Sequence, residues 1–302
     1  MTPGTNGGAA ISLAARRELW LHTGTACNLS CPFCHEGSQP ADRRLEAPTF
    51  DELRPVLDEA AAAGFERFAF TGGEPLILKD IVRILRHALR LAPCLVLTNG
   101  TAPLIRRPHH LAQLTGLNHQ IEFRVSIDYP DALRHDAGRG MQNFRKALEG
   151  VALLVNAGFA VGITRMQEPG EDKLAVEARY RALLRKNGLP EGLPLNALPE
   201  LGKPRPRGAL PTTPLAPSPN GDFVAAPACT RSRMVLRRNE VLRYSACPLV
   251  DDDPRFDLGA DLAAAISAAV TPSHPRCNIC RSTGVNYVGD PIENRVAGNI
   301  LA

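Results

Sequence analysis

Three cysteines lie close together in the stretch TACNLSCPFCHEG, residues 25–37, with the spacing C-x3-C-x2-C. A structural zinc site takes four ligands, and a disulfide framework takes an even number of cysteines. Three thiolates packed this tightly, from Cys27, Cys31 and Cys34, leave one position of a metal centre open. The spacing therefore favours a centre that binds a further molecule.

Three kinds of metal site fit this triplet. A cubane 4Fe-4S cluster takes four ligands, so three cysteines leave one iron free. A zinc ion needs a fourth ligand, and the adjacent His35 is cramped beside Cys34 for that purpose. The pattern C-x-x-C-H also occurs in c-type haem attachment, which needs a signal peptide, and residues 1–17 lack its apolar core. We favour the cluster with an open iron.

Five further cysteines complete the total of eight. Cys94 begins an apolar run and is expected to be a small core residue. The other four, Cys229, Cys247, Cys277 and Cys280, follow the pattern C-x17-C-x29-C-x2-C. Four thiolates can close a site completely, and on spacing alone both zinc and a 4Fe-4S cluster fit.

The elements that must position these residues alternate between strand and helix. We expect strands at residues 18–24, 67–75, 94–100, 120–128, 160–166 and 193–200, and helices at 49–64, 80–92, 109–116, 143–158 and 171–188. Thr49 and Glu52 form a capping box at the start of the first helix. Six β-α units predict an α/β fold with a parallel sheet, either open and doubly wound or a partial (βα)6 barrel. In both, functional residues lie at the carboxyl ends of the strands.

The regular alternation predicts four regions. Residues 1–17 form a flexible tail, 18–201 the barrel, 202–222 a proline-rich linker, and 223–302 a small domain stapled by metal. Six prolines lie in residues 201–222. In the last region we expect a hairpin at 234–246, turning at Arg238-Asn239, and a helix at 258–270.

Composition narrows the functional classes. An apolar content of 44% over 302 residues permits a sizeable core, and a net charge of +4 predicts no nucleic-acid partner. The sequence contains no run near the roughly 18 apolar residues of a membrane span. We therefore expect a cytoplasmic protein whose cysteines stay reduced and serve as metal ligands.

The cysteine triplet after the first strand, with Phe33 before its third cysteine, resembles the radical S-adenosylmethionine (SAM) superfamily. The resemblance covers residues 18 to about 200 and implies that Phe33 lies near the adenine of SAM. A second match is TGGEP, residues 71–75, which is similar to the turn that meets the amino group of the methionine moiety. It implies that Gly72 and Gly73 let the backbone come close and that Glu74 places negative charge beside the ammonium.

A third match is RVSIDYPDALRHDAGRG, residues 124–140. Ser126 and Asp128 lie on one side of a strand and, by the resemblance, point to the ribose and carboxylate side of the cofactor. Arg139 is then a salt-bridge partner for the methionine carboxylate, and Asn99 a further contact. The alternative is that Asp128 caps a turn and Arg139 is solvated. Residues 161–166 match the segment beside adenine.

Membership implies the chemistry as well. The reduced cluster gives one electron to the sulfonium of SAM, and the resulting 5′-deoxyadenosyl radical takes a hydrogen atom from a substrate. The four late cysteines resemble the SPASM/twitch extensions of this family, and their spacing is similar to that of an aminocyclitol-oxidising member. This implies an auxiliary 4Fe-4S cluster that relays electrons, and a reductant of the flavodoxin or ferredoxin type.

The substrate class stays open between two choices. Peptide-maturing relatives often carry a leader-binding domain ahead of the barrel, and only about 17 residues precede the first strand here. We therefore expect oxidation or modification of a small polar molecule, with a maturase of a ribosomal precursor peptide as the alternative. Glu200 and Arg165 are candidate catalytic or anchoring residues, and ion pairing is an equal alternative for them. A non-catalytic metal-binding module is a remote third choice.

Overall fold

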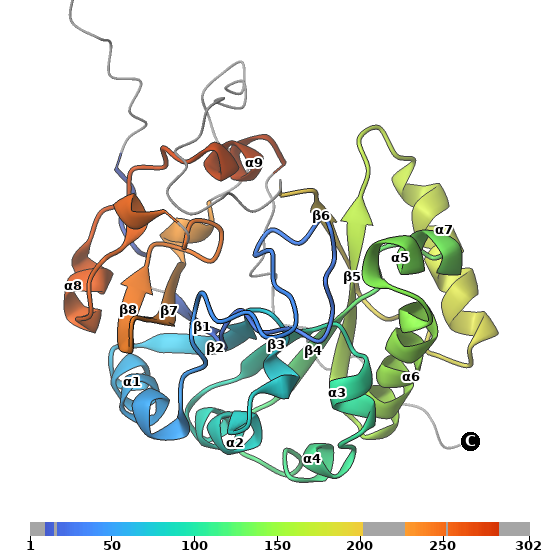
Figure 1. Ribbon diagram of the computed structural model, residues 1–302, viewed down its shortest axis with the longest axis horizontal. Helices are drawn as coiled ribbons and strands as arrows, with labels where there is room; N and C mark the ends of the chain where they lie inside the picture. Colours follow the sequence, from blue (N-terminus) through green and yellow to red (C-terminus); the bar gives the residue numbers. More distant parts are fainter. Residues whose placement is uncertain (1–9, 15–16, 202–226, 252, 284–302) are drawn as a thin grey trace, which may run out of the picture.

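The computed structural model describes residues 10–14, 17–201, 227–251 and 253–283. One eight-stranded sheet runs through it in the order β6-β5-β4-β3-β2-β1-β7-β8 (Figure 1). The strands are β1 (Arg17–His22), β2 (Phe65–Thr71), β3 (Cys94–Thr98), β4 (Ile121–Ser126), β5 (Ala160–Gln167), β6 (Leu195–Pro199), β7 (Ser232–Arg238) and β8 (Val241–Ser245). Strands β1 to β7 pair in parallel and β8 is antiparallel to β7, so the prediction of an α/β partial barrel is confirmed.

Helices follow the strands as the alternation predicts. They are α1 (Phe50–Ala62), α2 (Ile81–Leu91), α3 (Ala102–Ile105), α4 (His109–Ala112), α5 (Ala132–Arg139), α6 (Asn143–Asn156), α7 (Lys173–Lys186), α8 (Leu262–Ser267) and α9 (Pro275–Thr283). The capping box of Thr49 and Glu52 is present at the start of α1. Three helices were not foreseen from the sequence: α3, after β3, α5, after β4, and α9, which carries the last two cysteines.

Alternation along the strands divides the core in two. Leu19 and Leu21 of β1 pack with the helices in one apolar cluster, while Trp20 between them belongs to a second cluster on the other face. The second cluster contains Met234 of β7 and Cys229, and lies inside the curve of the sheet. Cys94 is buried in the first cluster, as expected of a core residue.

The predicted hairpin has a place in the main sheet. β7 pairs in parallel with β1, with Glu18 opposite Ser232, so the hairpin extends the barrel sheet and does not form a sheet of its own. Its turn lies at Asn239 and Glu240, both with positive φ, one residue later than expected. The proline-rich linker falls outside the described residues. Among the described helices, none has the length and apolar character needed to span a bilayer.

Candidate active site

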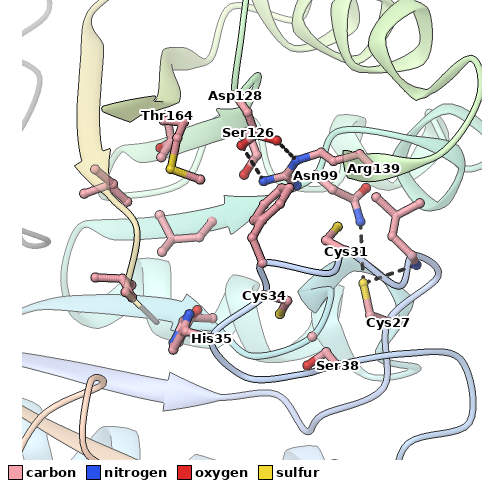
Figure 2. Close-up of a pocket in the computed structure, with 18 of the residues that line it drawn as sticks. Cys27, Cys31, Cys34, His35, Ser38, Asn99, Ser126, Asp128, Arg139 and Thr164 are labelled. Carbon is pink, nitrogen blue, oxygen red and sulfur yellow. Dashed lines mark hydrogen bonds and ion pairs between the residues drawn. The ribbon is translucent and has the colours of Figure 1, made fainter. Parts of the chain in front are cut away.

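A cavity of about 200 Å³ lies at the carboxyl ends of the strands (Figure 2). The three loop cysteines line one side of it, and the ends of β4, β5 and β6 line the other. The residues predicted from the sequence that line it are Cys27, Cys31, Phe33, Cys34, Gly72, Gly73, Asn99, Ser126, Asp128, Arg139, Arg165 and Glu200. The topology therefore collects, in one cavity, side chains that are spread over most of the barrel sequence.

The cysteine loop is fixed to the glycine turn after β2 by main-chain hydrogen bonds. The N–H of Gly73 donates to the carbonyl of Gly24 (2.9 Å), and that of Glu74 donates to the carbonyl of Ala26 (3.1 Å). A Cβ atom at Gly73 would overlap the carbonyl of Ala26, and Gly72 has φ of +127°. The two glycines are thus required by the close approach of the cysteine loop itself, and both segments lie on the same rim.

Replacing Gly73 by alanine is expected to displace the cysteine loop. The added methyl group meets backbone, which cannot move aside, so we expect a loss of about 2–3 kcal/mol in the free energy of unfolding. Chemical denaturation would measure it. Gly192→Ala is the matched control, because no atom lies within 4 Å of its added Cβ. Equal stability of the Gly73 and Gly192 variants would contradict the close approach.

The loop thiols have the character of metal ligands. Burial, with the nearby Glu74 and the other two thiols acting in the same direction, raises the pKa of Cys27 to about 12. Burial likewise raises the pKa of Cys31, against the lowering effect of the Arg139 guanidinium. Without a cation these thiols stay protonated, whereas a bound metal stabilises their thiolates. The donor set therefore fits a cationic metal centre at this rim.

Glu74 lies apart from the cavity lining. It is 1% exposed, and its carboxylate accepts hydrogen bonds from the hydroxyl of Thr98 (2.8 Å), the N–H of Asn99 (2.8 Å) and the N–H of Leu76 (3.1 Å). The resemblance placed this charge beside a ligand ammonium. In the structure Glu74 lies outside the cavity lining and ties the end of β3 to the turn after β2.

Asn99 reaches the cysteine loop. Its side-chain amide donates to the oxygen of Asn28 (2.9 Å) and lies 3.9 Å from the sulfur of Cys27 (Figure 2). The N–H of Leu29 also points to this sulfur, at 3.4 Å. Cys27 is therefore surrounded by donors that stabilise a thiolate.

Asp128, which is buried, and Arg139, which is partly buried, form an ion pair in the cavity wall (Figure 2). Nη2 of Arg139 lies 2.9 Å from one carboxylate oxygen of Asp128, and Nε lies against the other. The Arg139 guanidinium also lies 5.6 Å from the ring centre of Phe33. It is thus neither free nor solvated, and it presents an ion pair to the cavity.

Helix α5 positions this ion pair. His135 is buried, and its Nδ1 accepts a hydrogen bond from the N–H of Asp128 (3.2 Å). Burial lowers the pKa of His135 to about 4, so the ring is neutral at physiological pH. Gly138 packs directly against the ring of Phe33. His135 and Gly138 are therefore site residues that the sequence reasoning did not single out, and the N-cap Asp131 was the available signal for their helix.

The two candidate catalytic residues, Arg165 and Glu200, differ in burial and in their partners. Arg165 is 2% exposed and its guanidinium pairs with both carboxylate oxygens of Glu171, at 2.6 and 3.0 Å. This is the structural ion pair that the sequence left as an alternative. Glu200 is exposed at the cavity edge. Thr71, Thr164 and Met166 add to the lining.

The four late cysteines converge in a separate place. Cys229, Cys247 and Cys280 are buried in the inner apolar cluster with Trp20, and Cys277 packs against it. Burial, with the nearby thiol of Cys280 acting in the same direction, raises the pKa of Cys229 to about 11. Burial followed by the charges of the other three thiols raises the pKa of Cys247. Four thiols gathered around one apolar cluster fit a second metal centre.

Sulfur spacing bears on the kind of centre. Within the described part of the chain, three donor atoms come within 4.8 Å of one another at His22, Glu36 and Asp251, and at neither cysteine set. A tetrahedral zinc ion with Zn–S bonds of about 2.3 Å holds its sulfurs about 3.8 Å apart. The cysteines are therefore spread more widely than one zinc ion requires.

Comparisons with known proteins agree with this geometry. The family model of the radical SAM superfamily matches residues 21–181. An "AdoMet-dependent heme synthase" of Methanosarcina barkeri is 34% identical over 152 residues, which is 50% of this chain and 42% of that protein. A "GTP 3',8-cyclase" of Pectobacterium atrosepticum is 32% identical over 145 residues, 44% of this chain and 41% of that protein. The matches thus span about two fifths of the length of these relatives.

A solved structure is similar over more of the chain. "Native anSMEcpe with bound AdoMet" superposes with a TM-score of 0.59 at 13% identity, covering 83% of this chain and 81% of that one. The same protein has also been solved with AdoMet and a peptide bound. At this identity the likeness concerns the fold.

Proposed function

The chain belongs to the radical SAM superfamily, and from that premise we propose that it is a radical SAM oxidoreductase acting on a small polar molecule. Cys27, Cys31 and Cys34 would hold a 4Fe-4S cluster with one open iron. When bound, the cluster and SAM supply one-electron cleavage of the sulfonium and a carbon radical that removes a hydrogen atom from the substrate. The observation that carries the proposal is the cavity itself, which sets three thiols opposite polar strand ends.

The chain's own residues bind and orient around that chemistry. The main chain of Gly72 and Gly73 borders the cavity beside the cysteine loop and can meet the methionine amino group. Phe33 offers an aromatic face for the adenine. Ser126 and the Asp128–Arg139 pair offer a hydroxyl and fixed charges for the ribose and carboxylate. Glu74 contributes indirectly, by fixing the turn.

The late cysteines would hold an auxiliary 4Fe-4S cluster in a SPASM/twitch-like region. Their convergence in the inner cluster supports a shared centre, and their wide sulfur spacing supports a cluster over one zinc ion. All four thiolates are available as ligands, so the substrate need not bind there. We assign this centre to electron relay, with a flavodoxin- or ferredoxin-type protein as the external reductant.

The choice of a small polar substrate rests on two supports. One curated relative is named for GTP and another for making heme, both small molecules. Glu200, exposed at the cavity edge, can act as a base or an anchor for a polar group, whereas Arg165 is engaged by Glu171. A maturase of a precursor peptide stays the alternative, since a protein of this fold has been solved with a peptide.

We also propose a cytoplasmic location for the protein. All eight cysteines are free thiols, and the cytoplasm keeps thiols reduced.

Anaerobic reconstitution tests the proposal. With two cubane clusters we expect about eight irons and eight sulfides per chain. Adding dithionite and SAM should then release 5′-deoxyadenosine and methionine, measured by chromatography. Chain without iron is the control and should release neither. A reconstituted chain that binds iron but never cleaves SAM would be a binding module and would overturn the enzyme assignment.

A further inference from the structure

The loops that carry the two cysteine sets meet at one buried cation, Arg276. This residue lies in α9 directly before Cys277 and is 5% exposed. Its Nη1 donates to the carbonyl of Leu249 (2.9 Å), two residues after Cys247. Its Nη2 donates to the carbonyl of His35 (3.4 Å), directly after Cys34. One guanidinium therefore touches the first cysteine loop and the late cysteine loop.

A second contact joins the same two loops. Nε2 of His22 lies 3.5 Å from a carboxylate oxygen of Glu36 and 4.0 Å from one of Asp251. The N–H of Gly24 donates to Nδ1 of this ring, so Nε2 carries the proton and faces both carboxylates. These three side chains therefore bring the end of β1 next to both cysteine loops.

We propose that Arg276 couples the two cysteine sites electrostatically, so that its charge raises the reduction potential of both. The proposal rests on the two clusters of the proposed function. A guanidinium keeps its charge at all physiological pH values. Reduction adds one electron and no proton to a cluster, and a buried positive charge nearby stabilises that more negative state. A bonded route also connects the sites, from Cys34 through His35 and one hydrogen bond to Arg276 and Cys277.

Potentiometric titration of the reconstituted full-length chain, followed by electron paramagnetic resonance, tests the coupling. In Arg276→Gln we expect both midpoint potentials to fall, each by about tenfold in the reduction equilibrium, or about 59 mV for one electron. A chain lacking Cys27, Cys31 and Cys34 identifies the late-site signal. Arg276→Lys keeps the charge and should restore most of both potentials. Arg276→Met, an apolar residue of similar length, serves if the Gln variant does not fold.

Arg233 provides the matched control. It is 0% exposed, and its guanidinium donates to the carbonyls of Cys229 (2.9 Å) and Ala265 (2.8 Å). Within the described residues its guanidinium donates only to the carbonyls of Cys229, Ser232, Ala265 and Ala268, and none of these lies in the first cysteine loop. Arg233→Gln should therefore lower the potential of the late site and leave that of the first site within error of the wild type.

The outcomes of these titrations distinguish a failure of the Arg276 coupling from a failure of the proposed function. Eight irons per chain with an unchanged first-site potential in Arg276→Gln would overturn the coupling and leave the proposed function intact. A first-site shift as large in Arg233→Gln as in Arg276→Gln would also overturn it, since the effect would then not need the shared contact. Only about four irons in the wild type would remove the auxiliary cluster, and the coupling with it.

Discussion

Replacing Cys27, Cys31 and Cys34 together by alanine is expected to abolish reductive cleavage of SAM. The three thiols line the cavity and are the ligands we propose for the cluster with the open iron. The reconstituted variant should keep about four irons per chain, bound by the late cysteines, and release no 5′-deoxyadenosine. Iron analysis and chromatography of the reaction products measure both quantities in one preparation.

Cys94→Ala is the matched control for this variant. Cys94 is 2% exposed in the helix-facing core and lies in neither cysteine set. The control should lose some stability but keep its full iron content and its cleavage activity. Persistent cleavage in the triple variant would show that the cofactor cluster has been assigned to the wrong cysteines.

Replacing Cys277 and Cys280 by alanine is expected to separate cleavage of SAM from turnover of substrate. Both cysteines lie on α9, and Cys280 is buried in the inner apolar cluster. Loss of the proposed auxiliary cluster should remove about four irons and loosen this region, because metal binding there is coupled to folding. Limited proteolysis should cut residues 223–302 earlier than in the wild type. The hairpin of β7 and β8 should resist longest, because β1 holds it.

The barrel site should survive this change, since none of its ligands is altered. Cleavage of SAM without substrate should therefore continue while substrate turnover stops. Normal turnover by the double variant would exclude both a relay and a scaffold role for the late site. Zinc in the anaerobically purified wild type, with only about four irons, would replace the relay with a structural zinc region.

Most of the barrel could be predicted because its strands and helices are encoded by local sequence patterns. Alternating apolar runs and the capping box at Thr49 and Glu52 predicted six strands with helices after the first five, and the described residues contain them. The pairing of β7 with β1 could not be read in this way, since it joins Glu18 to Ser232 and periodicity carries no information on partners so far apart. Helix α5 was missed because its exposed Leu133 and buried His135 give no apolar stripe.

The sequence predicted which residues line the site better than it predicted the contacts that these residues make. The resemblance to the radical SAM superfamily implied that Ser126, Asp128 and Arg139 share one site, and all three line the cavity. Which partner each charge takes depends on neighbours within a few ångströms. Arg139 forms an ion pair with Asp128, and Arg165 forms one with Glu171. Glu74 accepts hydrogen bonds from two main-chain N–H groups and the hydroxyl of Thr98, and a sequence pattern does not reveal these partners.

The pairing of β1 with both β2 and β7 sets an order of events during synthesis on the ribosome. β1 is made first and gains β2 early, but its other edge waits for β7, whose residues emerge after the whole barrel. For that interval β1 is an unpaired edge, the kind of strand that recruits other chains into aggregates. Non-local pairing of this sort is also slow to form. A nascent chain released before Ser232 would therefore expose β1 permanently, next to the cysteine loop that follows it.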